Sequence, residues 1–230
     1  MTLAVDLHIH SCLSPCADDS MTPHNLTMMA HLKGLNAIAV CDHNACLNGR
    51  ACARAGERNG VLVVPGVEAT TIEEVHALCY FPQWEVAEDF CALLAAHQPV
   101  LANRPDLFGE QLILDEWDNE VGRCPRWLGQ PVALGLEEME REARGRGGVL
   151  VPAHINRPSN SVLANLGFLP PSLLARTVEV AGDFAPPQGL RAIRSSDAHD
   201  LGNLLETGFP LEAAACTAQA IVDALLTPIS

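Results

Sequence analysis

The sequence is poor in charged and aromatic residues, which make up 18% and 4% of its 230 residues. It contains a single lysine, Lys33, and carries a formal net charge of −14. Proteins bind nucleic acid through clustered Lys and Arg side chains, so the strongly negative net charge argues against stable binding of duplex nucleic acid. With one tyrosine in the whole chain, no basic groove lined by aromatic rings can be recognised for a single strand either.

Long apolar runs and paired cysteines are also missing. No run approaches the roughly 20 apolar residues that span a bilayer, and the N-terminus shows no basic segment followed by the apolar stretch of a signal peptide. We therefore expect a cytoplasmic protein without membrane contact. The nine cysteines are odd in number and show no CxxC spacing, so a disulfide framework is not expected.

Hydrophobic residues form 48% of the chain, which predicts an ordered globular protein. Its length is most simply explained by one domain spanning residues 1–230. Short apolar strands alternate with helices, and this pattern predicts a parallel sheet covered by helices on its outer face. Strands are expected at 2–9, 37–41, 61–67, 75–81, 149–151, 177–181 and 190–195, and helices at 22–34, 47–58, 85–97, 135–146 and 214–226.

Candidate metal ligands appear on the first predicted strand, in Asp6-Leu7-His8-Ile9-His10. Residues two apart in a strand project to the same face, so the side chains of His8 and His10 are placed to bind one metal ion together. Alone, the pair is weak evidence, because histidines on a half-buried strand are more often ordinary polar residues. Related motifs return after later apolar runs: Cys41-Asp42-His43-Asn44, Gly66-Val67-Glu68, Pro152-Ala153-His154 and Ser196-Asp197-Ala198-His199.

These polar residues all fall at or just after the carboxyl ends of predicted strands, where parallel α/β barrels place their active sites. About seven strands can be counted, so a closed, irregular barrel fits better than an open doubly wound sheet. Imidazole and carboxylate ligands together suit zinc, manganese or iron, and the lack of thiolate clusters argues against a structural zinc finger. Asp6 and Asp42 are expected to orient ligands or to bind backbone groups.

In their order and spacing, these five motifs resemble those of the PHP family, which is named after polymerase and histidinol phosphatase. The resemblance runs from Asp6 to His199 and so covers nearly the whole chain. It implies a single PHP domain, a distorted (β/α)7 TIM-like barrel of the α/β class, and a metal site at the carboxyl ends of the strands. It also implies two or three divalent metal ions (Zn, Mn or Fe) and hydrolysis of phosphoesters.

The metal ligands that the resemblance implies fall into three groups, with Glu68 shared as a bridging carboxylate. The groups are His8, His10, Glu68 and Asp197 for a first ion, His43, His199 and a loop residue for a second, and Glu68, His76 and His154 for a third.

Two of these positions have alternatives. The loop after the first motif offers Cys16, Asp18 and Asp19. Members of the PHP family often carry His or Asp in this loop. Counting back from Thr22 puts Asp18 where an acid is usual, so the resemblance favours Asp18 as the ligand, with Cys16 as the second choice. His76 alternates with apolar residues and therefore faces a polar interior, and its alternative is a core histidine with satisfied hydrogen bonds. The other histidines, His24, His31 and His97, are expected on helices as non-ligands.

The predicted reaction is hydrolysis of a small phosphate mono- or diester, with nucleotides among the candidates, by attack of a metal-activated hydroxide. Asp197 and His199 are the catalytic residues expected within the cluster. Arg157 follows His154 by three residues and is placed to bind phosphate as a planar fork, the alternative being a surface arginine stacked on Pro158. Residues 102–131, with a lid around 108–111, are expected to cover the site.

Three other functions compete with this prediction. A catalytically silent PHP scaffold that only binds metal would be expected to lack ligands, and here almost every expected ligand type is present. An amidohydrolase would typically bring a metal-bridging lysine, whereas Lys33 lies on a predicted helix. A nuclease like the polymerase-associated members ranks last because the chain has so few cations. Oligomeric state does not follow from the sequence.

Overall fold

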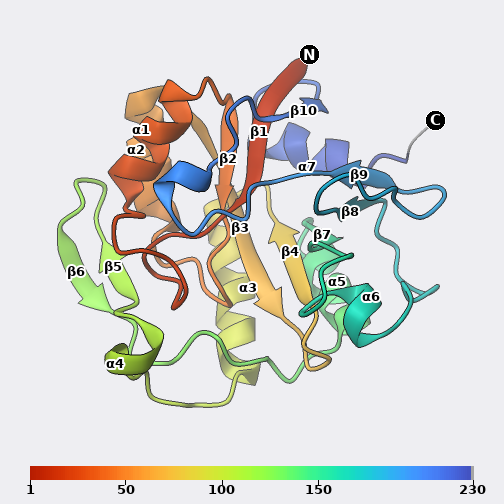
Figure 1. The fold of residues 1–230 in the computed structure, drawn as a ribbon, viewed down its shortest axis with the longest axis horizontal. Coiled ribbons are helices and arrows are strands. Elements are labelled where there is room, and N and C mark those ends of the chain that lie inside the picture. The colour runs from red at the N-terminus through yellow and green to blue at the C-terminus, as the bar shows by residue number, and fades with distance from the viewer. Residues whose placement is uncertain (229–230) are drawn as a thin grey trace.

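The computed structural model describes residues 1–228 and shows a mixed α/β fold built on one curled sheet (Figure 1). The sheet has six strands: β1 (Thr2–Ile9), β2 (Ala37–Val40), β3 (Leu62–Thr70), β4 (His76–Tyr80), β7 (Val149–Pro152) and β10 (Phe209–Glu212).

The strands of this sheet lie in the order β10-β1-β2-β3-β4-β7. β1, β2 and β3 are parallel, as the alternation of strands and helices predicts. β4 is antiparallel to both β3 and β7, and β10 is antiparallel to β1. The expectation of an all-parallel sheet is therefore wrong at these strands. Only a short turn connects β3 to β4, and such a turn joins antiparallel neighbours, whereas parallel strands need a crossover.

A separate parallel ribbon, β8 (Thr177–Glu179) and β9 (Arg191–Ile193), continues the curl beyond β7. Two isolated contacts link it to the sheet. The Ile155 N–H donates to the Glu179 carbonyl at 2.9 Å, and Ile9 forms a parallel bridge with Ala198. Within residues 1–228 the hydrogen-bonded strands thus form a curled half-barrel, the β8–β9 ribbon and a separate antiparallel pair between residues 112 and 123. A complete seven-stranded barrel stays a prediction.

The main helices lie close to their predicted ranges. α1 begins where the Thr22 side chain accepts a hydrogen bond from the Asn25 N–H and Pro23 occupies the first turn. α2 ends at Gly60, whose φ of 71° is left-handed and suits glycine. In Figure 1, α3 lies behind β3 and β4. The helices are α1 (Pro23–Leu32), α2 (Gly49–Asn59), α3 (Trp84–His97), α5 (Leu136–Gly145) and α7 (Ala218–Leu226).

Several short elements have no clear sequence signal, because three or four residues are too few to show a period. β10 is an edge strand that tolerates Pro210, which sequence reasoning treats as a strand breaker. The other short elements are α4 (Pro105–Phe108), β5 (Leu112–Leu114), β6 (Glu120–Arg123), α6 (Val162–Asn165) and the 3₁₀ turn η1 (Leu201–Asn203).

None of the helices within residues 1–228 has the length and apolar character that crossing a membrane requires.

Polar groups inside the sheet are matched by specific partners. The only tyrosine, Tyr80, is fully buried, and its hydroxyl donates to the Leu7 carbonyl at 2.7 Å, which ties β4 to β1. Asp6 accepts hydrogen bonds from the Ser196 N–H at 2.9 Å and the Leu205 N–H at 3.1 Å. Asp6 therefore binds backbone, as expected, and it anchors the loop that carries Asp197.

We predict that Tyr80→Phe lowers the free energy of unfolding by about 1–3 kcal/mol, because it leaves the buried Leu7 carbonyl with only the weak Cys41 thiol donor at 3.5 Å. Urea denaturation followed by circular dichroism measures this change. Thr2→Val is the control, since it removes an exposed hydroxyl that bonds to Glu212, and it should change stability by less than about 0.5 kcal/mol. Equal effects of the two variants would contradict the account of the Tyr80 bond.

Candidate metal centre

The carboxylate of Glu68, on β3, lies at the centre of a cluster of imidazoles and is 1% exposed. Burial by itself raises the pKa of Glu68, but the imidazoles of His76, His8 and His43 outweigh it and hold the pKa well below its usual range. Five ring nitrogens surround the carboxylate: His76 Nδ1 at 2.8 Å, His8 Nε2 at 3.3 Å and His154 Nε2 at 3.3 Å from Oε1, and His43 Nδ1 at 3.0 Å and His10 Nε2 at 3.4 Å from Oε2.

Asp197 supplies a second carboxylate, from the loop after β9. Its Oδ1 lies 3.0 Å from His10 Nε2 and 3.2 Å from His8 Nε2, and its Oδ2 pairs with the guanidinium of Arg157. Burial raises the pKa of Asp197, but the charge of His8 and the close contact with His10 lower it overall. Asp197 has φ 51° and His154 has φ 27°, both in the sparsely populated left-handed region. Strained backbone of this kind is concentrated at functional sites.

The loop after β1 brings Cys16, rather than Asp18, to the cluster. Cys16, His10, His43 and His199 each offer an atom within 4.8 Å of the others. Burial raises the pKa of the Cys16 thiol, but hydrogen bonds with His199 and His43 outweigh it and lower the pKa to about 7. The Asp18 side chain is exposed and accepts from the Ser20 N–H at 2.8 Å. Its own N–H donates to the His199 carbonyl at 2.8 Å, so Asp18 holds the two loops together through its backbone.

The cluster fits divalent cations by its geometry and its donors. Among the described residues, His154 Nδ1 is buried without a hydrogen-bond partner, and Glu68 Oε2 and His43 Nδ1 lie 3.0 Å apart without forming a hydrogen bond of good geometry. Unpaired buried polar atoms are costly, and cation binding satisfies such atoms. Imidazole, carboxylate and thiolate are the donors that zinc, manganese and iron take. Three groups converge closely enough for a shared ion: His10, Cys16, His43 and His199; His8, His10 and Asp197; and His43, Glu68 and His76.

Glu179, which was not predicted from the sequence, orients the His8 ring and binds the backbone of His154. It is 2% exposed on β8. Its Oε2 lies 3.0 Å from His8 Nδ1 and accepts from the His154 N–H at 2.9 Å. Because His8 Nδ1 donates to this carboxylate, Nε2 is the ring atom that faces the cluster, and it would bind an ion once its proton is lost. An acid inside a short apolar run was the only signal in the sequence.

A second chain of hydrogen bonds orients His10. The Ser14 hydroxyl donates its single hydrogen to Asp42 Oδ1 at 2.7 Å and lies 2.9 Å from His10 Nδ1. The hydroxyl must therefore accept from Nδ1–H of His10, which leaves His10 Nε2 as the atom that faces the cluster. Burial raises the pKa of Asp42, although hydrogen bonds from Ser11 and Ser14 oppose it. Asp42 thus orients a ligand through Ser14, which agrees with the supporting role expected from the sequence.

The remaining predicted residues lie as follows. Arg157 is 41% exposed at the mouth of a cavity of about 260 Å³ above the cluster. His24 and His31 are exposed on α1, and His97 at the end of α3 bonds to the Leu93 carbonyl. These three histidines belong to none of the ligand groups formed by residues 1–228.

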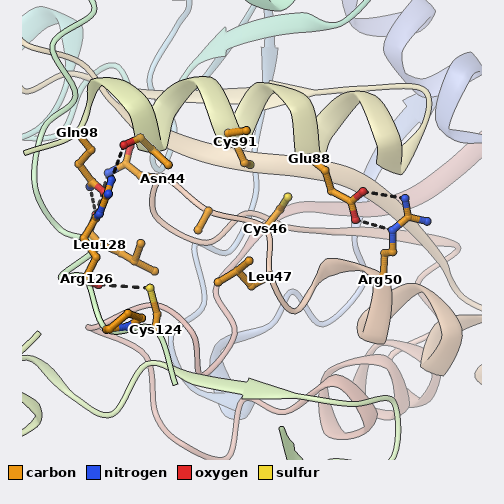
Figure 2. Close-up of a pocket in the computed structure, with 14 residues that line it drawn as sticks. Asn44, Cys46, Leu47, Arg50, Glu88, Cys91, Gln98, Cys124, Arg126 and Leu128 are labelled. Atoms are coloured by element: carbon orange, nitrogen blue, oxygen red, sulfur yellow. Dashed lines mark hydrogen bonds and ion pairs between the residues drawn. The ribbon is translucent and has the colours of Figure 1, made fainter. Parts of the chain in front are cut away.

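A larger cavity, of about 510 Å³, lies beside α3 and contains none of the predicted ligands (Figure 2). Its lining is mainly apolar and includes Cys46 and Cys91. An ion pair between Arg50 and Glu88 closes one end. The larger cavity therefore has a mainly apolar lining, in contrast to the polar cavity over Glu68.

If Cys16 is a metal ligand, bound metal should protect it from alkylation. In metal-free protein, iodoacetamide should modify Cys16 with a midpoint near pH 7, since the reactive thiolate forms above a pKa of about 7. Cys216 is the control. It is also exposed, but partial desolvation of its thiol raises its pKa. Peptide mass spectrometry with and without Zn²⁺ or Mn²⁺ measures both. Equal labelling of Cys16 in the two states, with metal loss in Asp18→Asn instead, would contradict this placement.

Glu179→Gln should weaken metal binding by about 10- to 100-fold, because the amide no longer holds His8 in the required tautomer. Titration against a competing chelator measures the affinity. Glu140→Gln is a matched control, since Glu140 is a buried carboxylate on α5 that bonds to the Leu174 N–H. Unchanged affinity in Glu179→Gln, or an equal loss in Glu140→Gln, would count against the orienting role.

No family model matches the chain. Solved structures share its fold. The lesion-specific endonuclease Q of Pyrococcus furiosus is 19% identical with a TM-score of 0.67, and the match covers 98% of this chain and 56% of the endonuclease. A candidate metal-dependent phosphoesterase of Bifidobacterium adolescentis is 20% identical with a TM-score of 0.61, over 96% of this chain and 95% of that protein. A two-domain protein of Bacteroides vulgatus with a predicted PHP-like phosphoesterase gives a TM-score of 0.54 at 19% identity, over 98% of this chain and 63% of that protein.

A curated 5′–3′ exoribonuclease of Haemophilus influenzae is 34% identical over 71 residues, which cover 31% of this chain and 25% of that enzyme. The chain thus spans about half the length of endonuclease Q and a quarter of the exoribonuclease. The structural neighbours confirm the resemblance to the PHP family at the level of the fold.

The neighbours also overturn one expectation. Endonuclease Q is found in complex with a 27-mer duplex substrate that has an abasic lesion at the active site, and this complex matches the chain with a TM-score of 0.65. The expectation of a small-molecule phosphoester substrate, without stable binding of duplex nucleic acid, is therefore wrong. Net charge sums the whole surface, whereas phosphates are neutralised locally, by the cations and arginines of a site.

Proposed function

We propose that this chain is a metal-dependent phosphoesterase that hydrolyses phosphodiester bonds in nucleic acid. The observation that carries the proposal is the buried carboxylate of Glu68 with five imidazoles around it, beside Asp197 and Arg157. The supporting comparisons are an endonuclease of the same fold and a sequence relative that is an exoribonuclease. The proposal also takes residues 1–230 as one domain, with β1, β2, β3, β4, β7, β8 and β9 as a distorted seven-stranded barrel.

Two or three divalent ions, zinc, manganese or iron, complete the proposed site. When bound, they activate water for attack and neutralise phosphate charge. We assign Cys16 to the loop position, because its thiol and not the Asp18 carboxylate lies among the imidazoles. The proposed ligands are His8, His10, Cys16, His43, Glu68, His76, His154, Asp197 and His199.

The chain's own residues bind and orient the phosphate. Arg157 has five N–H donors and uses part of this fork on Asp197, so the remaining donors at the cavity mouth are available to a phosphate oxygen. His199 Nδ1 lies 2.8 Å from the Asp197 carbonyl and donates to it, which leaves Nε2 for the cavity. The pair formed by Asp197 and Arg157 thereby sets the phosphate beside the cluster.

The activity assay uses 5′-labelled RNA, single-stranded DNA and duplex DNA with and without an abasic site, each with Mn²⁺, Zn²⁺ or Fe²⁺ and with a chelator control. Chelator-sensitive cleavage of at least one strand type is expected. Asp197→Asn should lower kcat by about 100-fold or more, since metal-ion stabilisation of a transition state amounts to several kcal/mol.

Asp223→Asn on the exposed face of α7 is the control variant, and it should keep full activity. The proposed function fails if no strand is cut with any metal. It also fails if cleavage persists unchanged in chelator or in Asp197→Asn.

A further inference from the structure

A recess of about 280 Å³ adjoins the cavity over the cluster and has a different character. The two spaces share Cys16, His43, His76 and Asn160 as a common wall. The cluster cavity contains carboxylates and Arg157, whereas the recess is lined by no Lys, Arg, Asp or Glu among the described residues. Its other lining residues are Pro15, Thr70, Leu107, Phe108, Trp127 and Gly129.

The rings of Phe108 and Trp127 form a stacked pair on the wall of this recess. Their centroids are 4.3 Å apart and their planes differ by 17°. Both residues are half-buried, whereas Phe81 and Phe90 are fully buried in the core. A partly exposed, stacked pair of rings next to a metal cluster is not needed for core packing, and its flat surface suits another aromatic ring.

The backbone fixes the pair in this position. Phe108 ends α4, and the next residue, Gly109, has φ 79° and lies so close to the loop carrying Cys16 that an added Cβ would be 2.9 Å from the Pro15 carbonyl oxygen. Trp127 belongs to a segment whose neighbours Cys124, Arg126 and Leu128 line the larger cavity in Figure 2. Trp127 lines the recess instead, where Gly129 lies directly against its indole.

We propose that the Phe108–Trp127 pair is a stacking platform for one nucleobase of the bound strand, next to the phosphate held at the cluster. This inference rests on the proposed function and adds the base subsite. Away from the wall shared with the cluster, the recess is lined by apolar and aromatic side chains that suit a flat, neutral base, and the adjoining cavity suits the phosphate. Asn160 and Thr70 provide polar groups at the edges. Stacking accepts every base, so the platform binds the strand without selecting its sequence.

The test compares strands that carry a base-free nucleotide, placed in turn at each position around the cleaved bond. At one position, loss of the base should raise KM for the unaltered protein by about 5- to 150-fold, the range measured for base stacking on aromatic side chains. Phe108→Ala and Trp127→Ala should raise KM similarly on the normal strand. On the strand that lacks this base they should have little further effect, because the same contact is already absent.

Phe108→Tyr and Trp127→Phe keep an aromatic ring, so, unlike the alanine variants, they should keep a lower KM on strands that contain the base than on base-free strands. This result separates stacking from a general loss of folding. Trp117→Leu is the matched control. Trp117 lies near β6, is 66% exposed and has the Arg58 guanidinium over one face of its ring. It does not line the recess, so its replacement should leave KM unchanged. Base-containing strands should also quench the part of the fluorescence that Trp127→Phe removes, while a base-free strand should not.

The outcomes distinguish this inference from the proposed function. If the protein cuts strands in a metal-dependent way but no base-free position changes KM, the platform is wrong and the phosphoesterase proposal stands. If the alanine variants raise KM equally on normal and base-free strands, the rings are structural and the platform is again wrong. If no strand is cut or bound, both proposals fail.

Discussion

The buried carboxylate of Glu68 is the charge on which the arrangement of the site depends. A charge removed from water is tolerated only where opposite charges and donors surround it. Here the compensation comes from His8 on β1, His10 directly after β1, His43 after β2, His76 on β4 and His154 after β7. These residues are far apart in the sequence, and the strands that carry or precede them are neighbours in the curled sheet drawn in Figure 1. The burial of this carboxylate therefore depends on the curl of the sheet.

The backbone around the cluster is held in costly conformations. Asn44, His154 and Asp197 all have positive φ, and such residues cost on the order of 1–3 kcal/mol each. Hydrogen bonds keep them in place. Asn44 donates to the Leu128 and Gln130 carbonyls and accepts from the Thr70 N–H, while His154 donates its N–H to Glu179. The rigid surroundings direct the ligand atoms inward before any ion binds, and this preorganisation is what a metal-dependent active site needs.

Sequence reasoning predicted the part of this structure that follows from period and spacing. The two-residue spacing of His8 and His10 and the apolar runs before His43, Glu68 and His154 place these side chains at strand ends, and the structure brings them together. Strand direction does not appear in an apolar pattern, so the antiparallel pairing of β4 was not foreseen. Whether Cys16 or Asp18 reaches the cluster depends on the path of a loop, and the sequence does not specify that path. The net charge led to the wrong expectation about nucleic acid, because it averages over the whole surface and does not describe the site.

In the proposed site, more than one metal ion shares Glu68. The number of ions per chain tests this directly, by elemental mass spectrometry of the unaltered protein and of Glu68→Gln, with circular dichroism to verify the fold. Two or three ions are expected in the unaltered protein and at least one fewer in Glu68→Gln, while Glu140→Gln should keep them all. The same number of ions in Glu68→Gln and the unaltered protein would contradict the shared role of Glu68.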